Sequence, residues 1–419
     1  MMYNEPSPLE VKVLSRRFTL ENSASIDTYL ATEGYKALEK ALGMGPEAII
    51  EEMKASNLRG RGGAGFPTGM KWGFVPKTSA KPKYIVVNAD ESEPGTCKDR
   101  LLIENDPHSL IEGVLIAALA VGARAAYIYI RGEYRYLIDI MDKAIAEAYA
   151  KGYLGKNILG KGLDFDCYTH TGAGAYECGE ESALLESLEG KRGIPRIRPP
   201  FPAVAGAWQC PTVLNNVETF CAAPAIIRDG GAAFAALGTP RNGGTRLFCI
   251  SGHVNKPGVY ELPMGFNLLR MIHEVGGGMR GGKKLKAVIP GGSSCPLLTA
   301  DECDLPMDFD SLAKAKSMLG SGGLVVMDED TDMVKAALRI MKFYAHESCG
   351  WCIPCREGTT WLKKMLTRFD EGQGQSSDIS LIGDLAKNML GRTFCPLGDA
   401  AALPTISIVE KFRHEFEAK

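Results

Sequence analysis

The chain has 419 residues, of which 45% are hydrophobic and 23% are charged, values that are ordinary for a soluble globular protein. Lysine and arginine number 48 against 50 aspartates and glutamates, and this formal net charge of −2 argues against a nucleic-acid partner or a polybasic membrane anchor. At roughly 100 to 200 residues per domain, we expect two to four domains rather than a single core.

The sequence predicts neither export nor a membrane span. The N-terminal segment MMYNEPSPLEVKVLSRR lacks the charged start and apolar run of a signal peptide. The longest apolar stretch, GVLIAALAVGARAAYIYI, is interrupted by Gly122 and Arg124, and we interpret it as a buried helix followed by a buried strand. Without export, the twelve cysteines are expected in a reducing compartment, where a close cluster binds metal or does redox work.

The first half of the chain alternates between strands and helices. Residues 35–56 have helical spacing, with Pro46 at a first-turn position, and lead into the glycine loop NLRGRGGAGFPTGMKW. The strand YIVVNAD, the apolar helix, the strand AAYIYIRG and the helix EYRYLIDIMDKAIAEAYAKG follow. This order predicts a parallel α/β sheet covered by helices. The proline-rich segment IPRIRPPFPAVAGAWQCPTVLNN is expected to be an ordered loop.

The pattern changes near LGTPRNGGTR. The next segment, TRLFCISGHVNKPGVYELPMG, predicts two strands joined by a turn, FNLLRMIHEVGGG predicts one helix, and KLKAVIPGG predicts another strand. This combination indicates a small β-grasp-like domain. From Asp332 onward the spacing is mostly helical. We place the domain boundaries at 1–238, 239–330 and 331–419.

Four cysteines have the spacing of metal ligands. Cys349, Cys352 and Cys355 form C-x2-C-x2-C, and Cys395 follows 40 residues later, directly before Pro396. Zinc is usually held by two cysteine pairs, whereas three close thiolates and a remote fourth before proline are typical of a [4Fe-4S] cluster. The spacing therefore favours the cluster, with zinc as the alternative.

The glycine loop is a candidate for a nucleotide site. Gly60, Gly62 and Gly65 satisfy G-x-G-x-x-G, which lets a backbone approach a pyrophosphate. A helix rather than a strand precedes the loop, so this is not an ordinary dinucleotide-binding βαβ unit, and a surface glycine turn is the alternative. Positive charge for a phosphate would come from Arg59, Arg61 and Lys71.

Acidic residues follow a buried strand. Asp90, Glu91 and Glu93 come directly after YIVVNA, and the carboxyl ends of strands are where open α/β sheets bind ligands. These carboxylates could bind nucleotide hydroxyls, with a solvated turn as the alternative. Glu180 and Glu181 form a second acidic pair of the same kind. Asn215, Asn216 and Thr219 add polar groups, while Phe66, Phe74 and Phe201 could stack on planar rings or belong to a core.

Seven motifs occur together in one order, from about Leu58 to about Ala401: GRGGAGFPTGMKW, VNADESEPGTCKDR, YECGEESALLESLEG, PPFPA, NNVETF, ESCGWCIPCREG and TFCPLGD. Together they resemble the NADH-binding, FMN- and [4Fe-4S]-containing subunit of respiratory complex I, NADH:quinone oxidoreductase (the 51 kDa or F-type family). They are also similar to relatives in soluble hydrogenases and formate dehydrogenases.

The resemblance implies a Rossmann-like flavin domain, a ubiquitin-like β-grasp domain and a C-terminal helical bundle with one [4Fe-4S] cluster. It implies an NADH dehydrogenase in which hydride passes from the nicotinamide C4 to flavin N5 and single electrons then reach the cluster. Hydride transfer needs orientation more than a general base, so a site of glycines, amides and carboxylates is reasonable.

The resemblance also assigns residues. Glu93 would lie between flavin and nicotinamide, and Glu181 beside the adenosine ribose, where its charge would favour NADH over NADPH. The nucleotide site would be lined by Gly60, Arg61, Gly62, Gly63, Ala64, Gly65, Phe66, Lys71, Phe74 and Phe201, with Phe66 and Phe201 near the adenine. FMN would contact Asn88, Asp90, Glu91, Tyr176, Gly179, Glu180, Asn215, Asn216 and Thr219. The cluster would bind Cys349, Cys352, Cys355 and Cys395. Arg198, where some relatives have lysine, is assigned no contact.

The chain has one cluster motif, so a partner must accept its electrons. The resemblance implies a thioredoxin-like [2Fe-2S] subunit (24 kDa type) and a larger iron–sulfur subunit (75 kDa type) that lead toward quinone. It also implies a cytoplasmic location, peripheral on the inner face of the cell membrane. Two alternatives stay open: a diaphorase subunit of a soluble NAD-linked hydrogenase or formate dehydrogenase, and a nucleotide-binding scaffold with structural zinc.

Overall fold

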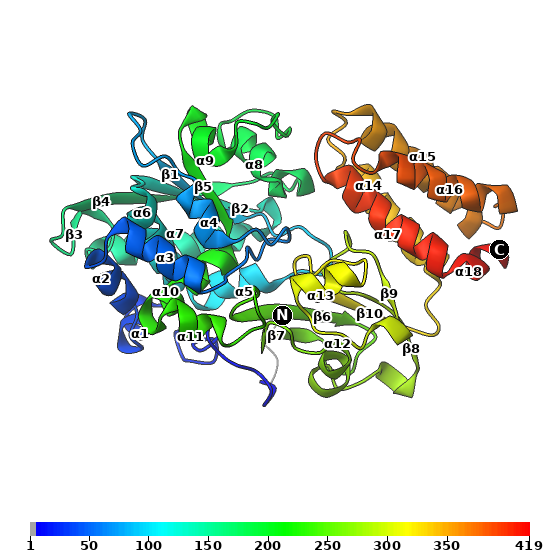
Figure 1. Ribbon diagram of the computed structural model, residues 1–419, viewed down its shortest axis with the longest axis horizontal. Coiled ribbons are helices and arrows are strands. Elements are labelled where there is room, and N and C mark those ends of the chain that lie inside the picture. The colour runs from blue at the N-terminus through cyan, green and yellow to red at the C-terminus, as the bar shows by residue number, and fades with distance from the viewer. Residues whose placement is uncertain (1–5) are drawn as a thin grey trace.

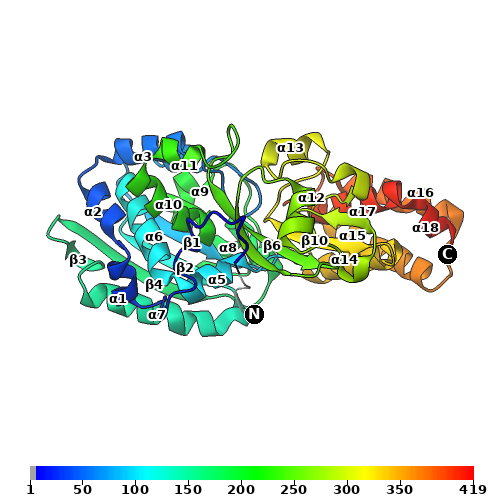
Figure 2. The ribbon, with the colours of Figure 1, turned by 90° about the horizontal axis from the view of Figure 1, so that it is seen from below.

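The computed structural model describes residues 6–419, which form three regions that follow one another along the chain (Figure 1). A sheet of five strands forms the core of each of the first two regions, and the third is helical. Figure 2 shows the same succession from below. The first five residues, which begin the segment where we expected no signal peptide, lie outside the described residues.

The first sheet has the strand order β3-β4-β2-β1-β5. Strands β1, β2, β4 and β5 are parallel, which confirms the expected α/β sheet. Strand β3 pairs antiparallel with β4 and forms an edge hairpin that the alternation of strands and helices did not indicate. The bounds are β1 (Tyr84–Ala89), β2 (Ala125–Ile130), β3 (Gly155–Ile158), β4 (Leu163–Thr171) and β5 (Thr212–Asn216).

Helix α6 (Pro107–Val121) is buried along almost its whole length, as its apolar sequence predicts, and packs against β1 and several helices. It begins at Asp106, whose side chain accepts a hydrogen bond from Ser109 N, and it ends at Gly122, which adopts a φ of 74°. The other helices of this region are α1 (Ile26–Ala31), α2 (Lys36–Leu42), α3 (Pro46–Ala55), α4 (Thr68–Gly73), α5 (Lys98–Asn105), α7 (Arg135–Ala150), α8 (Glu181–Leu188), α9 (Pro202–Ala205), α10 (Val217–Asp229) and α11 (Gly231–Ala235), with 3-10 turns at Gly132–Tyr134, Tyr176–Gly179 and Ala207–Gln209.

Residues 35–56 form the two helices α2 and α3 rather than one. Gly43 and Gly45 separate them, and Pro46 takes the first position of α3, where its missing amide hydrogen costs nothing. Helix α3 ends at Ala55, before the glycine loop, and α4 follows the loop. The loop therefore connects two helices. The sequence indicated the helix before the loop but not α4, since the next predicted element was the strand YIVVNAD.

The second sheet has the order β7-β6-β10-β8-β9, in which only β6 and β10 are parallel. The expected helix FNLLRMIHEVGGG consists of the single turn α12 (Leu268–Arg270) and a π-helical turn (Met271–Val275). The remaining bounds are β6 (Thr245–Gly252), β7 (Gly258–Pro263), β8 (Leu285–Ile289), β9 (Leu298–Thr299), β10 (Gly323–Asp328) and α13 (Phe309–Lys314), with 3-10 turns at Arg280–Gly282 and Ala300–Glu302. The mixed α/β class with a β-grasp-like second region is confirmed.

The third region packs α14 (Met333–Glu347), α15 (Ile353–Asp370), α16 (Ser376–Met389), α17 (Leu397–Lys411) and α18 (Arg413–Glu417) around one apolar core. Helix α15 begins directly after Cys352, and α17 begins two residues after Cys395. Helix starts therefore position the four cysteines. The exact domain boundaries 238/239 and 330/331 stay a prediction. In residues 6–419, no helix combines the length and the apolar character that a membrane crossing requires.

Candidate nucleotide and iron–sulfur sites

The acidic, amide and glycine motifs meet at the carboxyl edge of the first sheet. Asn88 at the end of β1 lies opposite Asn216 at the end of β5. The Asn88 side chain donates to Gly179 O (2.8 Å), and a side chain at Gly179 would lie 3.4 Å from Asp90 Oδ2. Three segments that are distant in sequence thus share one edge, where open α/β sheets bind their ligands.

The glycine loop lies over the N-terminus of α10. Arg61 N donates to Thr219 Oγ1 (2.9 Å), and a Cβ built on Gly62 would lie 3.3 Å from the Asn216 Cβ. Gly60 N donates to Phe66 O (2.9 Å), which closes the loop on itself. A bare backbone beside a helix N-terminus suits a phosphate, because unpaired amides and the helix dipole both favour negative charge.

Some side chains assigned to this site are engaged elsewhere. The Arg61 guanidinium is buried and donates to Gly243 O (2.8 Å) and Thr245 O (3.0 Å), so it does not supply the expected charge beside a phosphate. Desolvation lowers its pKa to about 9. Glu91 accepts hydrogen bonds from the first amides of α5, at Asp99 (2.8 Å) and Arg100 (3.1 Å). These two side chains hold the framework of the site together.

The two asparagines of NNVETF are also bound within the protein. Asn215 Oδ1 accepts from Trp72 Nε1 (3.0 Å), and Asn216 donates to Asp99 Oδ2 (2.6 Å) while its Oδ1 caps α10 at Glu218 N (3.0 Å). Glu180 caps α8 by accepting from Ser182 N and Ala183 N. Side chains expected to bind FMN therefore also set the ends of the helices that surround it.

Glu93 is held by residues from both of the first two regions. Tyr176 donates to its Oε2 (2.7 Å), while Ser294 N (2.8 Å) and Ser293 Oγ (3.4 Å) donate to its Oε1. Burial raises the pKa of Glu93, and these three donors oppose the rise. A side chain at Gly292 would come within 2.5 Å of Glu93 Cγ, so only glycine fits. Sequence reasoning missed Ser293 and Ser294, whose only signal is the turn PGGSS.

Glu181 lies between two cations. Lys71 Nζ is 2.9 Å from its Oε2, and Arg198 Nη1 is 2.9 Å from its Oε1. Burial alone would raise the pKa of Glu181, but the charges of Lys71 and Arg198 outweigh burial and lower it. Glu181 is therefore held ionised. Arg198, which the sequence left without a contact, is one of its two partners.

The three phenylalanines are surface residues. Phe66, Phe74 and Phe201 are 46%, 55% and 57% exposed, and the rings of Phe66 and Phe74 lie 6.0 Å apart. Side chains this exposed do not belong to a core, so that alternative is excluded for all three phenylalanines. Exposed rings beside a glycine loop are available to stack on a planar ligand.

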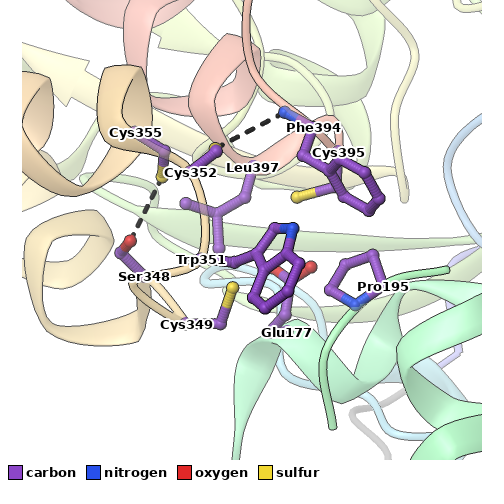
Figure 3. A pocket seen from close by; sticks show the side chains of 10 residues that line it. All are labelled: Glu177, Pro195, Ser348, Cys349, Trp351, Cys352, Cys355, Phe394, Cys395 and Leu397. Atoms are coloured by element: carbon purple, nitrogen blue, oxygen red, sulfur yellow. Dashed lines mark hydrogen bonds between the residues drawn. The ribbon is translucent and has the colours of Figure 1, made fainter. Parts of the chain in front are cut away.

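All four cysteines of the motif line one pocket, which Figure 3 shows at close range. Cys349, Cys352 and Cys355 come from the start of α15 and the loop before it, and Cys395 comes from the loop before α17. The other residues that line the pocket are Glu177, Pro195, Ser348, Trp351, Phe394 and Leu397.

The arrangement of the four thiols suits an iron–sulfur cluster. They come from two segments and line one pocket, and the irons of a [4Fe-4S] cluster occupy separate corners that each take one cysteine. Burial raises the pKa of Cys355 to about 11, so bound iron must supply the charge that keeps the thiolate.

Residues that the sequence analysis did not identify complete the pocket. Ser348 Oγ is hydrogen-bonded to Cys355 Sγ (3.2 Å), and Phe394 N donates to Cys352 Sγ (3.4 Å). Hydrogen bonds to ligand sulfurs tune the potential of a cluster. Glu177 is buried beside Cys395, and its position inside YECGEES was the available signal.

Comparisons with known proteins agree with this geometry. Three family models match: the Nuo51 FMN-binding domain over residues 53–225, the SLBB domain over 246–334 and the NADH-ubiquinone oxidoreductase-F iron-sulfur binding region over 335–419. The second F-type subunit of NADH-quinone oxidoreductase of Rhizobium meliloti (strain 1021) is 55% identical over 407 residues, 97% of each chain. The F-type subunit of the Streptomyces coelicolor enzyme is 51% identical and covers 99% of this chain and 92% of its own.

Among solved structures, the NAD+-reducing [NiFe]-hydrogenase in its air-oxidized state is similar, with a TM-score of 0.84 and 36% identity. The match covers 98% of this chain and 67% of that chain. Fold and site together define a flavin-dependent NADH dehydrogenase that also carries an iron–sulfur cluster. The chain belongs to the family of F-type subunits of NADH-quinone oxidoreductase, as the seven motifs indicated. Its cofactors are FMN and a [4Fe-4S] cluster, and its substrate is NADH.

Proposed function

We propose that this chain is the electron-input subunit of a multisubunit NADH:quinone oxidoreductase, in which electrons from NADH pass through FMN and the cluster to partner subunits. One observation carries the proposal. Tyr176 donates to Glu93 in the nucleotide site, and the next residue, Glu177, lines the cluster pocket. Two sites joined by consecutive residues are close enough to work as one electron path.

The residues have distinct tasks in this function. Bound flavin accepts a hydride and releases electrons singly. Glu93, fixed by Tyr176 and Ser294, orients the reacting rings without exchanging a proton. Glu181 holds the adenosine ribose and rejects a 2′-phosphate by charge repulsion. The other residues assigned to the two sites keep their proposed roles, except that Arg61 contributes its backbone to the site and not its guanidinium.

The third region offers a docking surface for the next electron carrier. Trp351, Ile353 and Phe394 are exposed, and Trp351 and Phe394 also line the cluster pocket. Apolar side chains gathered at the rim of a redox centre are typical of a protein interface. We assign this rim to the thioredoxin-like [2Fe-2S] subunit and the larger iron–sulfur subunit, in a complex on the inner face of the membrane.

A diaphorase subunit is the second candidate. The similarity to the NAD+-reducing hydrogenase favours it, because that structure shares the fold over nearly the whole of this chain. Copurification from native membranes separates the two: quinone-linked iron–sulfur subunits support the first function, and a hydrogenase or formate dehydrogenase subunit supports the second.

An anaerobic visible spectrum before and after NADH tests the shared chemistry, with flavin, iron and zinc measured on the same sample. We expect one FMN and about four irons per chain, and bleaching by NADH. A colourless protein with zinc that ignores NADH would overturn the proposal. Colour that NADH does not bleach would retain the cofactors and refute the nucleotide site.

A further inference from the structure

The segment that carries Glu93 is fastened to the second sheet at successive positions. It runs from the end of β1 to the start of α5. Its contacts are Glu93 with Ser294 N (2.8 Å), Pro94 O with Ser293 N (3.2 Å), Thr96 Oγ1 with Ser321 Oγ, and Cys97 N with Cys249 Sγ (3.2 Å). The last contact joins two cysteines 152 residues apart in sequence.

Cys97 and Cys249 face each other across the boundary between the two sheets. Cys97 is partly exposed at the N-cap of α5, and Cys249 on β6 is 2% exposed. Cys97 N donates to Cys249 Sγ (3.2 Å), which places the Cys249 sulfur against the backbone of Cys97. Glycines allow this approach, since a Cβ on Gly323 would lie 2.6 Å from Gly95 O. A sulfur this close to the backbone of another cysteine suits disulfide formation, since bridged cysteines have Cα atoms only about 5.5–6 Å apart.

The two thiols differ in reactivity. The hydrogen bond from Cys249 and the charge of Arg100 outweigh burial and Glu104, and they lower the pKa of Cys97 to about 7. The same hydrogen bond, burial and the charge of Glu91 raise the pKa of Cys249 well above its usual value. Cys97 is thus the nucleophile of the pair, and Cys249 is its protonated partner.

We propose that Cys97 and Cys249 are a peroxide-sensitive dithiol whose disulfide covalently joins the Glu93 segment to the second sheet. The Cys97 thiolate attacks hydrogen peroxide, an S–O bond forms, the O–O bond breaks, and water leaves with one added proton. The Cys249 sulfur then attacks the sulfenic sulfur, an S–S bond forms, and a second water carries away the hydroxyl and the Cys249 proton. Two thiols and one peroxide give one disulfide and two waters.

Peptide mapping of the full-length holoprotein tests this site. The protein is treated with hydrogen peroxide at increasing stoichiometry, free thiols are alkylated, and iron is measured in parallel. Trypsin places Cys97 in peptide 84–98 and Cys249 in peptide 247–270, and each peptide contains no other cysteine. We expect a linked pair about 2 Da lighter than the two reduced peptides together, formed before iron is lost.

Variants make the outcome specific. Cys249→Ser is expected to abolish the linked pair and to leave a sulfenic acid on Cys97 that dimedone traps. Cys97→Ser is expected to abolish the linked pair and leave Cys249 fully alkylatable after unfolding. Cys221→Ser, which removes a buried thiol of α10 outside the pair, should retain the link. Full alkylation of both cysteines in the parent after peroxide, with the iron intact, would overturn the proposal, as would a Cys97 link to any other cysteine.

Discussion

At the scale of single residues, the carboxylates of the nucleotide site are distinguished by their partners. Glu181 is held by two cations, Glu93 by neutral donors, and Glu91 by backbone amides of α5. Because only Glu181 has cationic hydrogen-bond partners, its pKa is lowered, whereas burial raises the pKa values of Glu93 and Glu91.

We predict that Glu181→Gln relaxes the preference for NADH. The substitution removes the carboxylate that pairs with both Lys71 and Arg198, so the two cations become more available to a 2′-phosphate, although Arg198 keeps Glu180 as a partner at 3.4 Å. We expect the kcat/KM ratio of NADPH to NADH to rise by about tenfold or more, the equivalent of roughly 1.4 kcal/mol. Steady-state kinetics with both nucleotides measures it. Glu186 on the same helix pairs with Arg196 instead, so Glu186→Gln serves as the control. An unchanged ratio in Glu181→Gln would refute the role assigned to Glu181.

We predict that Tyr176→Phe shifts the acidic limb of the pH profile upward. Burial already raises the pKa of Glu93, and the Tyr176 hydroxyl lowers it by stabilising the ionised form. Without that donor the carboxylate protonates at higher pH. The fall of kcat/KM on acidification should begin at a higher pH than in the parent, with activity above the limb retained. A limb at the parent position would show that Glu93 ionisation does not limit the reaction.

At the scale of elements, the conformation of the glycine loop depends more on Gly65 than on Gly60. Gly65 adopts a φ of +66°, and its Cβ would lie 2.3 Å from the Phe309 ring, whereas a Cβ on Gly60 makes only an ordinary contact at 3.5 Å. We predict that Gly65→Ala destabilises the protein by about 1–3 kcal/mol and weakens NADH binding. Gly60→Ala is the matched control. Urea unfolding and the KM for NADH measure both effects, and equal losses in the two variants would contradict this interpretation of the loop.

Elements were predictable where a local pattern decides them. The strands YIVVNAD and AAYIYIRG and helix α7 were predicted because their apolar spacing matches the face they bury. The hairpin of β3 and β4 was not predicted. Strand β3 has only one buried residue, and its pairing with β4 is what makes this segment a strand. The helix predicted from FNLLRMIHEV widens into a π-helical turn, which spacing alone does not reveal.

At the scale of the whole molecule, buried charges join the two sheets. Glu218 on α10 is fully buried, 2.7 Å from Lys98 Nζ, and its Oε1 accepts from Leu247 N of β6 (2.9 Å). Arg61 and Arg246 lie fully buried in the same boundary. Buried charges of both signs hold this boundary together, so the loss of one leaves the others uncompensated.

We predict that Glu218→Gln lowers the free energy of unfolding by roughly 3 kcal/mol at neutral pH. Burial raises the pKa of Glu218, but Lys98 and Arg246 outweigh burial and lower it. A carboxylate with a lowered folded pKa contributes stability above its unfolded pKa and loses it as pH falls through the folded value. The difference in the free energy of unfolding between parent and variant should therefore become smaller as the pH falls. Denaturant unfolding at several pH values measures it, with Glu47→Gln at an exposed pair as the unaffected control. The same difference in the free energy of unfolding at every pH would contradict the prediction.

The sequence by itself determined the cluster and the family. Cysteine spacing is a local arrangement that a [4Fe-4S] cluster requires, and seven motifs in one order identify the family, whose resemblance implied FMN and NADH. The α/β sheet followed from periodicity, which is also a local pattern. Only the tertiary structure decided which side chains serve the site. Glu93 meets Ser294 across 201 residues and Lys71 meets Glu181 across 110, while the Arg61 guanidinium turns into the boundary between the sheets. Such pairings depend on how two sheets and a helical region pack together, and no local pattern encodes that packing.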